Sequence, residues 1–256
     1  MKKSFLCKLG TFAVFVFAGV LLSGCAGRYF SPSECREPDI SLEELEGKKQ
    51  LAMDPERKFA DATSFVQRET LTYSLPLLGD TVFVIETFYK KPDKFRTDMR
   101  QDNKLIFSTI YNNGQAVRIN YTDNTVTQVT GEELEELNLV FRMNLPNSTY
   151  QSTFDKVEFQ ECEIDREQYY RVRGITEHAK IPPMDFYIGK TSMMTKGIVL
   201  EGKSEVRIDS YDLYDGVIIP DTTSINQDGI ELHSKVLTYK LNANLKESFF
   251  TLPPVK

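Results

Sequence analysis

A long succession of short strand-like runs, separated by turn residues, constrains the fold of this chain more than any other feature. Asn113-Gly114 and Asp123-Asn124 stand between such runs and are typical of hairpin turns. The runs cover 64–75, 81–90, 94–100, 104–111, 115–122, 125–129, 156–164, 168–176, 184–189, 197–201, 204–214, 217–226 and 230–242. So many short strands, mostly joined by hairpins, predict a curved antiparallel sheet or barrel.

A few helices accompany these strands. Ser41-Leu42-Glu43-Glu44 is a capping box and predicts a short helix that ends near Gly47, and Asp54-Pro55 predicts a second helix start. Thr130-Gly131-Glu132-Glu133 is another capping box in the middle of the chain. The helix that it opens has an apolar face made by Leu134, Leu137 and Phe141. The fold class is therefore mainly β with accessory α.

The N-terminus combines a basic start with an uncharged apolar block. Lys2, Lys3 and Lys8 precede the block, and Leu22-Ser23-Gly24-Cys25 has the form of a lipobox, in which the cysteine thiol receives a lipid. The block is short for a bilayer-spanning helix, which needs ~20 apolar residues. The segment is thus typical of a bacterial lipoprotein signal peptide, and a plain transmembrane anchor is the alternative interpretation.

This interpretation divides the chain into three parts. We expect residues 1–24 to be removed as the signal peptide and residues 25–40 to form a polar tether from a lipidated Cys25. Residues 41–256 would then form the folded domain. In Gram-negative bacteria an Asp after the lipidated cysteine commonly retains a lipoprotein in the inner membrane. Ala26 stands there in this chain, which favours the outer membrane, facing the periplasm.

The charge balance argues against nucleic acid as a partner. Without the three lysines of the leader the chain carries 28 basic and 37 acidic residues, a net charge of −9 with His neutral. An acidic protein is repelled by the phosphates of nucleic acids and by acidic lipid surfaces. We therefore expect contact with the membrane through the N-terminal lipid only.

Two cysteines remain once Cys7 has left with the leader and Cys25 carries lipid. Cys35 and Cys162 form an even pair in an oxidising compartment, and we expect a disulfide between them. Two unpaired buried thiols are the alternative. A metal site built on two cysteines without clustered histidines is not expected.

No residue pattern indicates catalysis. His178 and His233 stand alone in "ITEHAKIPP" and "IELHSKV", outside any serine-hydrolase or metalloprotease motif. The acidic run "GEELEEL" is typical of a solvated helix face. We expect no enzyme activity and no cofactor.

Several strands are apolar on both faces. In "TVFVIETFY", Val82 and Val84 point one way while Phe83, Ile85 and Tyr89 point the other. Two apolar faces indicate that each face is covered. Either a helix packs into the concave side of the sheet, or the sheet encloses an apolar cavity. These residues alone leave both possibilities open.

Two longer stretches resemble the outer-membrane lipoprotein-sorting family, which has the LolA/LolB-like fold. In "YKKPDKFRTDMRQDNKLIFSTIYNNGQAVRINYTDNTVTQVTG" the matching features are Lys91-Pro92, Phe95-Arg96, Asn113-Gly114 and Tyr121. In "YDGVIIPDTTSINQDGIELHSKVLTYKLNANLKESFFTLP" they are Asp215-Gly216-Val217, Pro220, Asn242 and Phe249 to Pro253. Together the two stretches cover about half of the mature chain.

The resemblance implies an unclosed β-barrel with a helical lid over an apolar cavity that accepts acyl chains such as palmitate. The family's basic residue before the proline, which helps to hold the lid, corresponds to Lys91, where Arg is frequent. The aromatic residue at the cavity corresponds to Phe95, and the Trp usual in the aromatic strand is missing here. We expect the cavity to be lined by Phe83, Ile85, Phe88, Phe95, Phe107 and Ile119. We expect the lid to present Leu134, Leu137 and Phe141, held by Lys91.

These implications predict an anchored envelope lipoprotein that binds the acyl chains of lipids or lipoproteins, as a carrier or an acceptor in their transport. Ordinary core packing of Phe95 and a solvated Lys91 are the plainer alternatives for those two residues. The alternative function is a regulatory or protein-interaction module on the same fold, with an envelope protein as its partner.

Overall fold

The computed structural model divides the chain into two compact units. It describes residues 29–75, 79–177, 181–227 and 230–255. Within that part, residues 61–144 and 233–255 belong to the first unit, and residues 29–60 and 145–232 to the second. The predicted signal peptide, residues 1–24, and Cys25 lie outside the described residues, so the lipid anchor stays a prediction.

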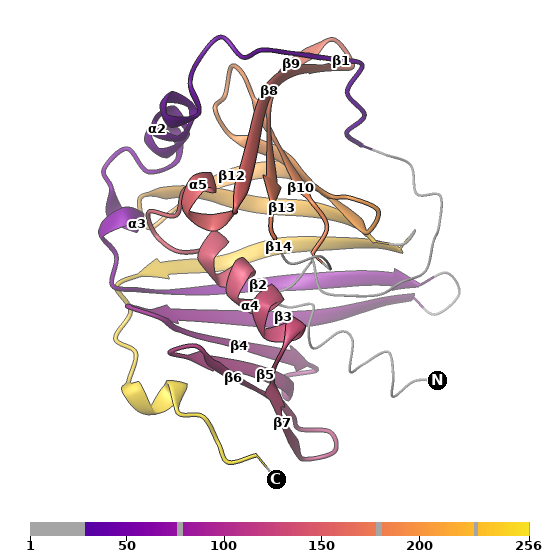
Figure 1. The fold of residues 1–256 in the computed structure, drawn as a ribbon. Coiled ribbons are helices and arrows are strands. Elements are labelled where there is room, and N and C mark those ends of the chain that lie inside the picture. Colours follow the sequence, from indigo (N-terminus) through magenta and orange to yellow (C-terminus); the bar gives the residue numbers. More distant parts are fainter. Residues whose placement is uncertain (1–28, 76–78, 178–180, 228–229, 256) are drawn as a thin grey trace. The chain divides into compact units, whose positions relative to one another are not determined.

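The first unit is an antiparallel meander (Figure 1). Its strand order is β14, β2, β3, β4, β5, β6, β7, and each strand from β2 to β7 pairs antiparallel with the next. Asn113 and Gly114 have φ values of 50° and 79°, as a two-residue hairpin turn requires. The strands are β2 (Ser64–Leu75), β3 (Gly79–Lys90), β4 (Lys94–Gln101), β5 (Lys104–Asn112), β6 (Gln115–Asn120), β7 (Thr125–Val129) and β14 (Ile230–Leu241).

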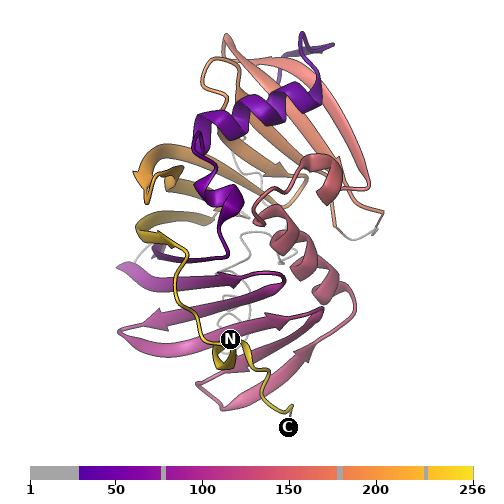
Figure 2. The ribbon, with the colours of Figure 1, turned by 90° about the vertical axis from the view of Figure 1, so that its left-hand side faces the viewer.

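Both faces of this meander are covered, as its two-sided apolar pattern predicts. Helix α4 (Glu132–Met143) runs across the strands on one face, which we call the inner face (Figure 1). On the opposite, outer face the C-terminal segment runs across the ends of the strands, and its short helix η1 (Glu247–Phe250) contacts β4 and β5 (Figure 2). Phe250 is fully buried there.

The second unit is another antiparallel meander, with the strand order β1, β8, β9, β10, β11, β12, β13. Its strands are β1 (Glu34–Arg36), β8 (Lys156–Ile164), β9 (Glu167–Ile175), β10 (Met184–Gly189), β11 (Thr195–Leu200), β12 (Ser204–Tyr214) and β13 (Val217–Gln227). Helix α2 (Leu42–Met53) contacts β13 (Figure 2). The short helix α5 (Tyr150–Thr153) places the Tyr150 ring 5.1 Å from that of Phe186.

The predicted helix starts are partly correct. The Ser41 hydroxyl accepts a hydrogen bond from the Glu44 N–H at 3.1 Å, but the helix continues past Gly47 to Met53. Asp54 accepts from the N–H groups at the start of α3 (Lys58–Asp61), as expected of a helix start. The Thr130 capping box is wrong, because Gly131 is the N-cap residue of α4 and no side chain caps it.

The segment expected to be a free tether is held against the second unit. The Phe30 ring stacks on Tyr187 with 4.9 Å between ring centroids, and the Tyr29 N–H donates to Glu205 at 2.6 Å. Gly197 makes room for Phe30, because a Cβ at that position would lie 2.0 Å from its ring. Residues 29–36 are therefore part of the folded unit, since burial of two aromatic rings offsets the entropy of ordering them.

The predicted disulfide between Cys35 and Cys162 is confirmed. The two residues lie directly opposite each other on β1 and β8, with their Cα atoms 4.1 Å apart. The bond closes a sequence separation of 127 residues and fixes the edge strand β1 to the second unit.

The fold class is confirmed as mainly antiparallel β with accessory helices. Neither meander closes on itself, because β7 is the last strand of the first unit and β1 is the outermost strand of the second. Among the described residues no helix combines the length and the apolar character needed to cross a bilayer.

Candidate functional site

An aromatic row crosses the inner face of the first unit. Directly opposed residues of antiparallel strands share a face, and the register aligns Phe65, Tyr89, Phe95, Tyr111, Ala116 and Val129 from β2 to β7. All six are buried. Burial raises the pKa of Tyr89 and of Tyr111 to about 12, so both phenols are neutral at physiological pH.

A second apolar row runs parallel to the first, four residues further along β3. Ile85 on β3 aligns with Met99 on β4 and Phe107 on β5, and all three are buried. Phe83 is also buried and lies two residues before Ile85 on β3, so its side chain faces the same side of the sheet. Four of the six predicted lining residues, Phe83, Ile85, Phe95 and Phe107, therefore share the inner face.

Polar side chains fill the row between these two. They are Gln67, Thr87, Thr97, Thr109, Arg118 and Thr127, aligned across β2 to β7. Thr97 and Thr109 are buried, and the side chain of Arg118 is 15% exposed. The inner face is thus a polar row flanked by two apolar rows, with one cation near its β7 end.

Helix α4 closes the inner face with the residues that the sequence predicts. The Phe141 ring stacks on Phe95 with 4.2 Å between centroids and an interplanar angle of 2°, and it meets Tyr111 edge-on at 4.6 Å. Leu137 is buried and Leu134 is half-buried. In this conformation α4 occupies the space over Phe95 with its own aromatic ring.

Arg118 ties the sheet to α4. Its guanidinium forms a short ion pair with Glu133 in the first turn of α4 through Nη1, and lies 5.7 Å from the centroid of the Phe107 ring. Its Nε is buried without a hydrogen-bond partner. The sequence analysis missed both residues of this pair. The alternation of "QAVRIN" carries the signal for Arg118, since it shares a face with Ala116.

Glu69 places a carboxyl group on the same inner face, opposite Ile85. It accepts hydrogen bonds from the Ser234 hydroxyl at 2.9 Å and from the Gln67 amide at 3.2 Å. Burial raises the pKa of the Glu69 carboxyl, and the two hydrogen bonds, which lower it, offset only part of this effect. The inner face therefore carries a carboxyl group on β2 and a guanidinium group on β6.

Phe88 and Ile119 lie on the outer face, so the expectation that they line one cavity with the other four residues is wrong. Phe88 aligns with Val66 and Arg96, and its ring meets that of Phe249 at 4.7 Å. Ile119 aligns with Ser108 on the same side. Because both faces of β3 are apolar, hydrophobicity alone does not tell which face Phe88 shares with the other lining residues. In the structure Phe88 packs on the C-terminal segment through Phe249.

Lys91 is exposed in the turn between β3 and β4 and forms no contact with α4 that the described residues show. Its neighbours Lys90 and Lys94 instead hold the C-terminal segment, since both pair with Glu247. These two ammonium groups lower the pKa of Glu247 to about 2. Glu133 of α4 forms an ion pair with Arg118 on β6.

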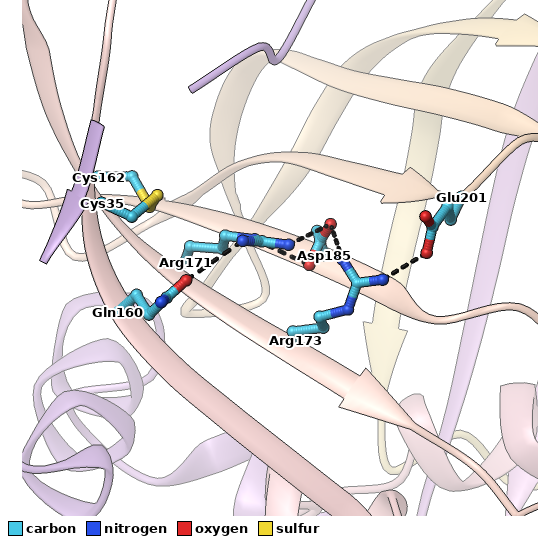
Figure 3. Close-up of polar contacts among 7 residues, drawn as sticks. All are labelled: Cys35, Gln160, Cys162, Arg171, Arg173, Asp185 and Glu201. Carbon is cyan, nitrogen blue, oxygen red and sulfur yellow. Dashed lines mark hydrogen bonds and ion pairs between the residues drawn. A yellow bond between two sulfur atoms is a disulfide. The ribbon is translucent and has the colours of Figure 1, made fainter. Parts of the chain in front are cut away.

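The second unit carries a cross-strand ion-pair network (Figure 3). Arg171 on β9 donates to both carboxylate oxygens of Asp185 on β10, at 2.9 and 3.0 Å, and Arg173 donates to the same group at 3.2 Å. Arg171 also donates to Gln160, and Arg173 pairs with Glu201. Since the charges satisfy one another, this network stabilises the pairing of β9 with β10.

The described residues bring no three His, Cys, Asp or Glu side chains together in a way that could hold a metal ion. No protein-family model matches the chain, and no curated protein matches it. The comparison with solved structures is therefore the one that bears on the fold.

Three solved structures are similar along most of the chain. A DUF1329 family protein from Desulfovibrio piger has a TM-score of 0.57 and 9% identity, and the match covers 81% of this chain and 97% of that one. A LolA superfamily protein from Nitrosomonas europaea has a TM-score of 0.57 and 11% identity, with 83% and 98% covered. A Vibrio parahaemolyticus domain named for outer membrane lipoprotein sorting has a TM-score of 0.56 and 9% identity, with 82% and 97% covered.

Identities this low establish a shared fold and nothing finer. The matched fold is the one that the Lys91-Pro92, Phe95-Arg96 and Asn113-Gly114 motifs predict. This chain has a LolA-like fold.

Proposed function

We propose that this protein binds acyl chains of lipids or lipoproteins on the inner face of the first unit. It would act as a carrier or acceptor in lipoprotein or lipid transport in the bacterial envelope. The observation that carries the proposal is the pair of apolar rows on the inner face, which lies under helix α4 and contacts its Phe141 ring. The lipoprotein-sorting name of a protein with the same fold supports it.

The energetics suit hydrocarbon as cargo. An acyl chain exposes on the order of 400–500 Å² of apolar surface, and its burial is worth about 10–12 kcal/mol. A carrier must recover most of this free energy, or the lipid stays in its membrane. Aromatic and aliphatic side chains provide contact without directional bonds, so the chain can also leave.

Entry of a ligand requires α4 to move. The Phe95–Phe141 stack and the Arg118–Glu133 ion pair hold the helix on the sheet. An acyl chain would replace the Phe141 ring on Phe95 with similar apolar contact, which offsets the loss of the stack. We propose that Phe83, Ile85, Phe95 and Phe107 line the opened site and that Leu134, Leu137 and Phe141 form the lid.

The proposal includes the lipid anchor at Cys25 and a location at the periplasmic side of the outer membrane. The anchor favours a protein that acts at its own membrane, because multiple acyl chains on one cysteine hold a protein almost permanently. We infer no catalytic role, since the charged side chains that the described register of β2 to β7 places on the inner face are Glu69 and Arg118, which lie four strands apart.

A matched pair of variants tests the proposal in a soluble form that begins at Ala26. Uptake of a fluorescent fatty acid is measured for Phe141→Ala, which loosens the lid, and for Phe249→Ala, which removes the same ring from the outer face. We expect faster and tighter uptake in the first variant and unchanged uptake in the second. Absence of uptake in all three proteins, with no amphiphile found by mass spectrometry of the purified protein, would overturn the proposal.

A regulatory or interaction module is the second candidate. It is favoured by the stacking of Phe141 on Phe95, because the Phe141 ring already fills the position that an acyl chain would take. Crosslinking in intact membranes separates the two functions. Attached lipid supports the first candidate, and an attached envelope protein without lipid supports the second.

A further inference from the structure

Arg118 has a hydrogen-bond donor, Nε, that has no partner while α4 covers the inner face. Its side chain is 15% exposed on the inner face beneath α4, between Thr109 and Thr127 in the polar row. A guanidinium in such a place needs anionic or hydrogen-bonding partners, because partial burial weakens its hydration. The structure provides one carboxylate, that of Glu133, which uses Nη1.

The remaining edge of the guanidinium is a ready site for an anion. Nε is buried and has no partner, which costs free energy as long as it stays unpaired. Nε and Nη2 together form the edge that binds a carboxylate or a phosphate with two parallel hydrogen bonds. Glu133 binds the guanidinium through Nη1, so a second anion could accept a hydrogen bond from the unpaired Nε.

The surroundings of Arg118 suit a ligand that joins an anion to a hydrocarbon chain. Phe107 lies against the guanidinium and begins the apolar row that continues through Met99 and Ile85. A chain that starts at β6 and crosses to β2 passes over four strand spacings, ~19 Å at about 4.8 Å each. At the far end the carboxyl of Glu69 disfavours a second anion, which gives the ligand a direction.

We propose that Arg118 binds the anionic group of the ligand, so that the protein selects acyl chains that carry a carboxylate or a phosphate. This inference rests on the proposed acyl-binding function and deepens it. The neutral ester of the same chain would have to leave Nε unpaired, so it would bind more weakly.

The test compares palmitate, hexadecyl phosphate and methyl palmitate by calorimetry with the soluble form that begins at Ala26. We expect the two anions to bind at least tenfold more tightly than the methyl ester. Arg118→Gln should abolish this preference while its affinity for the ester stays within twofold. Arg118→Lys keeps the charge and loses the forked donor geometry, so it should retain a reduced preference for the anions. Because it keeps the charge, it also controls for unfolding of Arg118→Gln caused by loss of the charge.

Arg100→Gln is the matched control, because Arg100 pairs with Glu86 on the outer face of the same sheet. It should keep the preference for the anions. Tighter binding of palmitate would identify a fatty acid as the source of the anion, and tighter binding of hexadecyl phosphate a phospholipid headgroup. Both results support the proposal.

The possible results distinguish failure of the Arg118 inference from failure of the proposed acyl-binding function. Equal affinities of the wild type for anion and ester, or an equal loss of both in Arg118→Gln, overturn the role of Arg118 and leave acyl binding intact. Failure of the wild type and of Phe141→Ala to bind any of the three ligands overturns the acyl-binding function itself.

Discussion

At the scale of single residues, the inner face of the first unit is shaped by two charged side chains on opposite sides of the meander. Glu69 and Arg118 occupy inward positions of alternating strands, where an apolar residue would be the simplest choice. Charged groups in such places cost stability unless they are paired. Arg118 has its partner in Glu133, whereas Glu69 accepts hydrogen bonds from two neutral donors.

Replacement of Glu69 by Gln should stabilise the protein at neutral pH. Because burial raises the pKa of Glu69 above the unfolded value of about 4.3, its contribution is fully present below that value. The contribution is lost as the pH rises through the folded pKa. Glu69→Gln keeps the shape without the charge, so its melting temperature should exceed that of the wild type at pH 7 and equal it near pH 4.

The matched control for this prediction is Glu86→Gln, since Glu86 lies on the outer face of β3 and pairs with Arg100 at 3.0 Å. It should give no gain in melting temperature at pH 7. A lower melting temperature of Glu69→Gln at pH 7 would show that the hydrogen bonds from Ser234 and Gln67 to the charged form outweigh the cost of burial.

At the scale of elements, two segments cover the two faces of one meander by different means. Helix α4 contacts the sheet through the Phe141 ring and through the ion pair of Glu133 with Arg118. The C-terminal segment is held by polar contacts: Lys90 donates to the carbonyl of Leu245 at 2.7 Å, and Arg96 donates to that of Phe249 at 3.2 Å. We propose that α4, and not the C-terminal segment, is the element that an apolar ligand displaces.

The attachment of the C-terminal segment to the sheet should weaken at low pH. Lys90 and Lys94 lower the pKa of Glu247 to about 2, so its contribution is present above the unfolded value of about 4.3. It is lost as the pH falls through about 2. Glu247→Gln should therefore melt at a lower temperature than the wild type at pH 6, and the difference should vanish as the pH approaches 2.

Amide hydrogen exchange of residues 245–250 provides a second measurement for this variant. Faster exchange in that segment at pH 6, with unchanged exchange in α4, would place the effect where the structure has the ion pair. A uniform increase across the first unit would contradict it.

At the scale of the whole molecule, the disulfide is a covalent link between the N-terminal segment and a folded unit. Removal of it by Cys35→Ser together with Cys162→Ser should cost ~4–5 kcal/mol by the loop-entropy model, because the closed loop is long. Chemical unfolding of the oxidised protein and the double variant measures the difference. A reducing agent should destabilise the wild type by a similar amount and leave the variant unchanged.

The Phe30 contact limits what the loss of this bond can do. If the stack of Phe30 on Tyr187 holds the segment by itself, the double variant should keep its near-ultraviolet circular dichroism at low denaturant. Loss of that signal without denaturant would mean that the disulfide is required for the segment to bind at all.

Local signals in the sequence predicted the strands well. The run at 64–75 is β2 (Ser64–Leu75), and the run at 94–100 is β4 (Lys94–Gln101). Turn residues and alternation act within a few residues, so they can be recognised without the rest of the chain. The same holds for the apolar face of α4, whose Leu137 and Phe141 are buried as expected.

The sequence by itself predicted the antiparallel strands, the amphipathic helix α4 and the pairing of Cys35 with Cys162, because each follows from local pattern or from counting. Only the tertiary structure decided that Phe88 and Ile119 face the C-terminal segment's side, that Phe30 packs on Tyr187, and that Arg118 meets Glu133. These contacts join segments that are distant along the chain, so no local pattern reveals them. When both faces of a strand are apolar, the side on which each residue lies is decided by the elements that pack on the two faces.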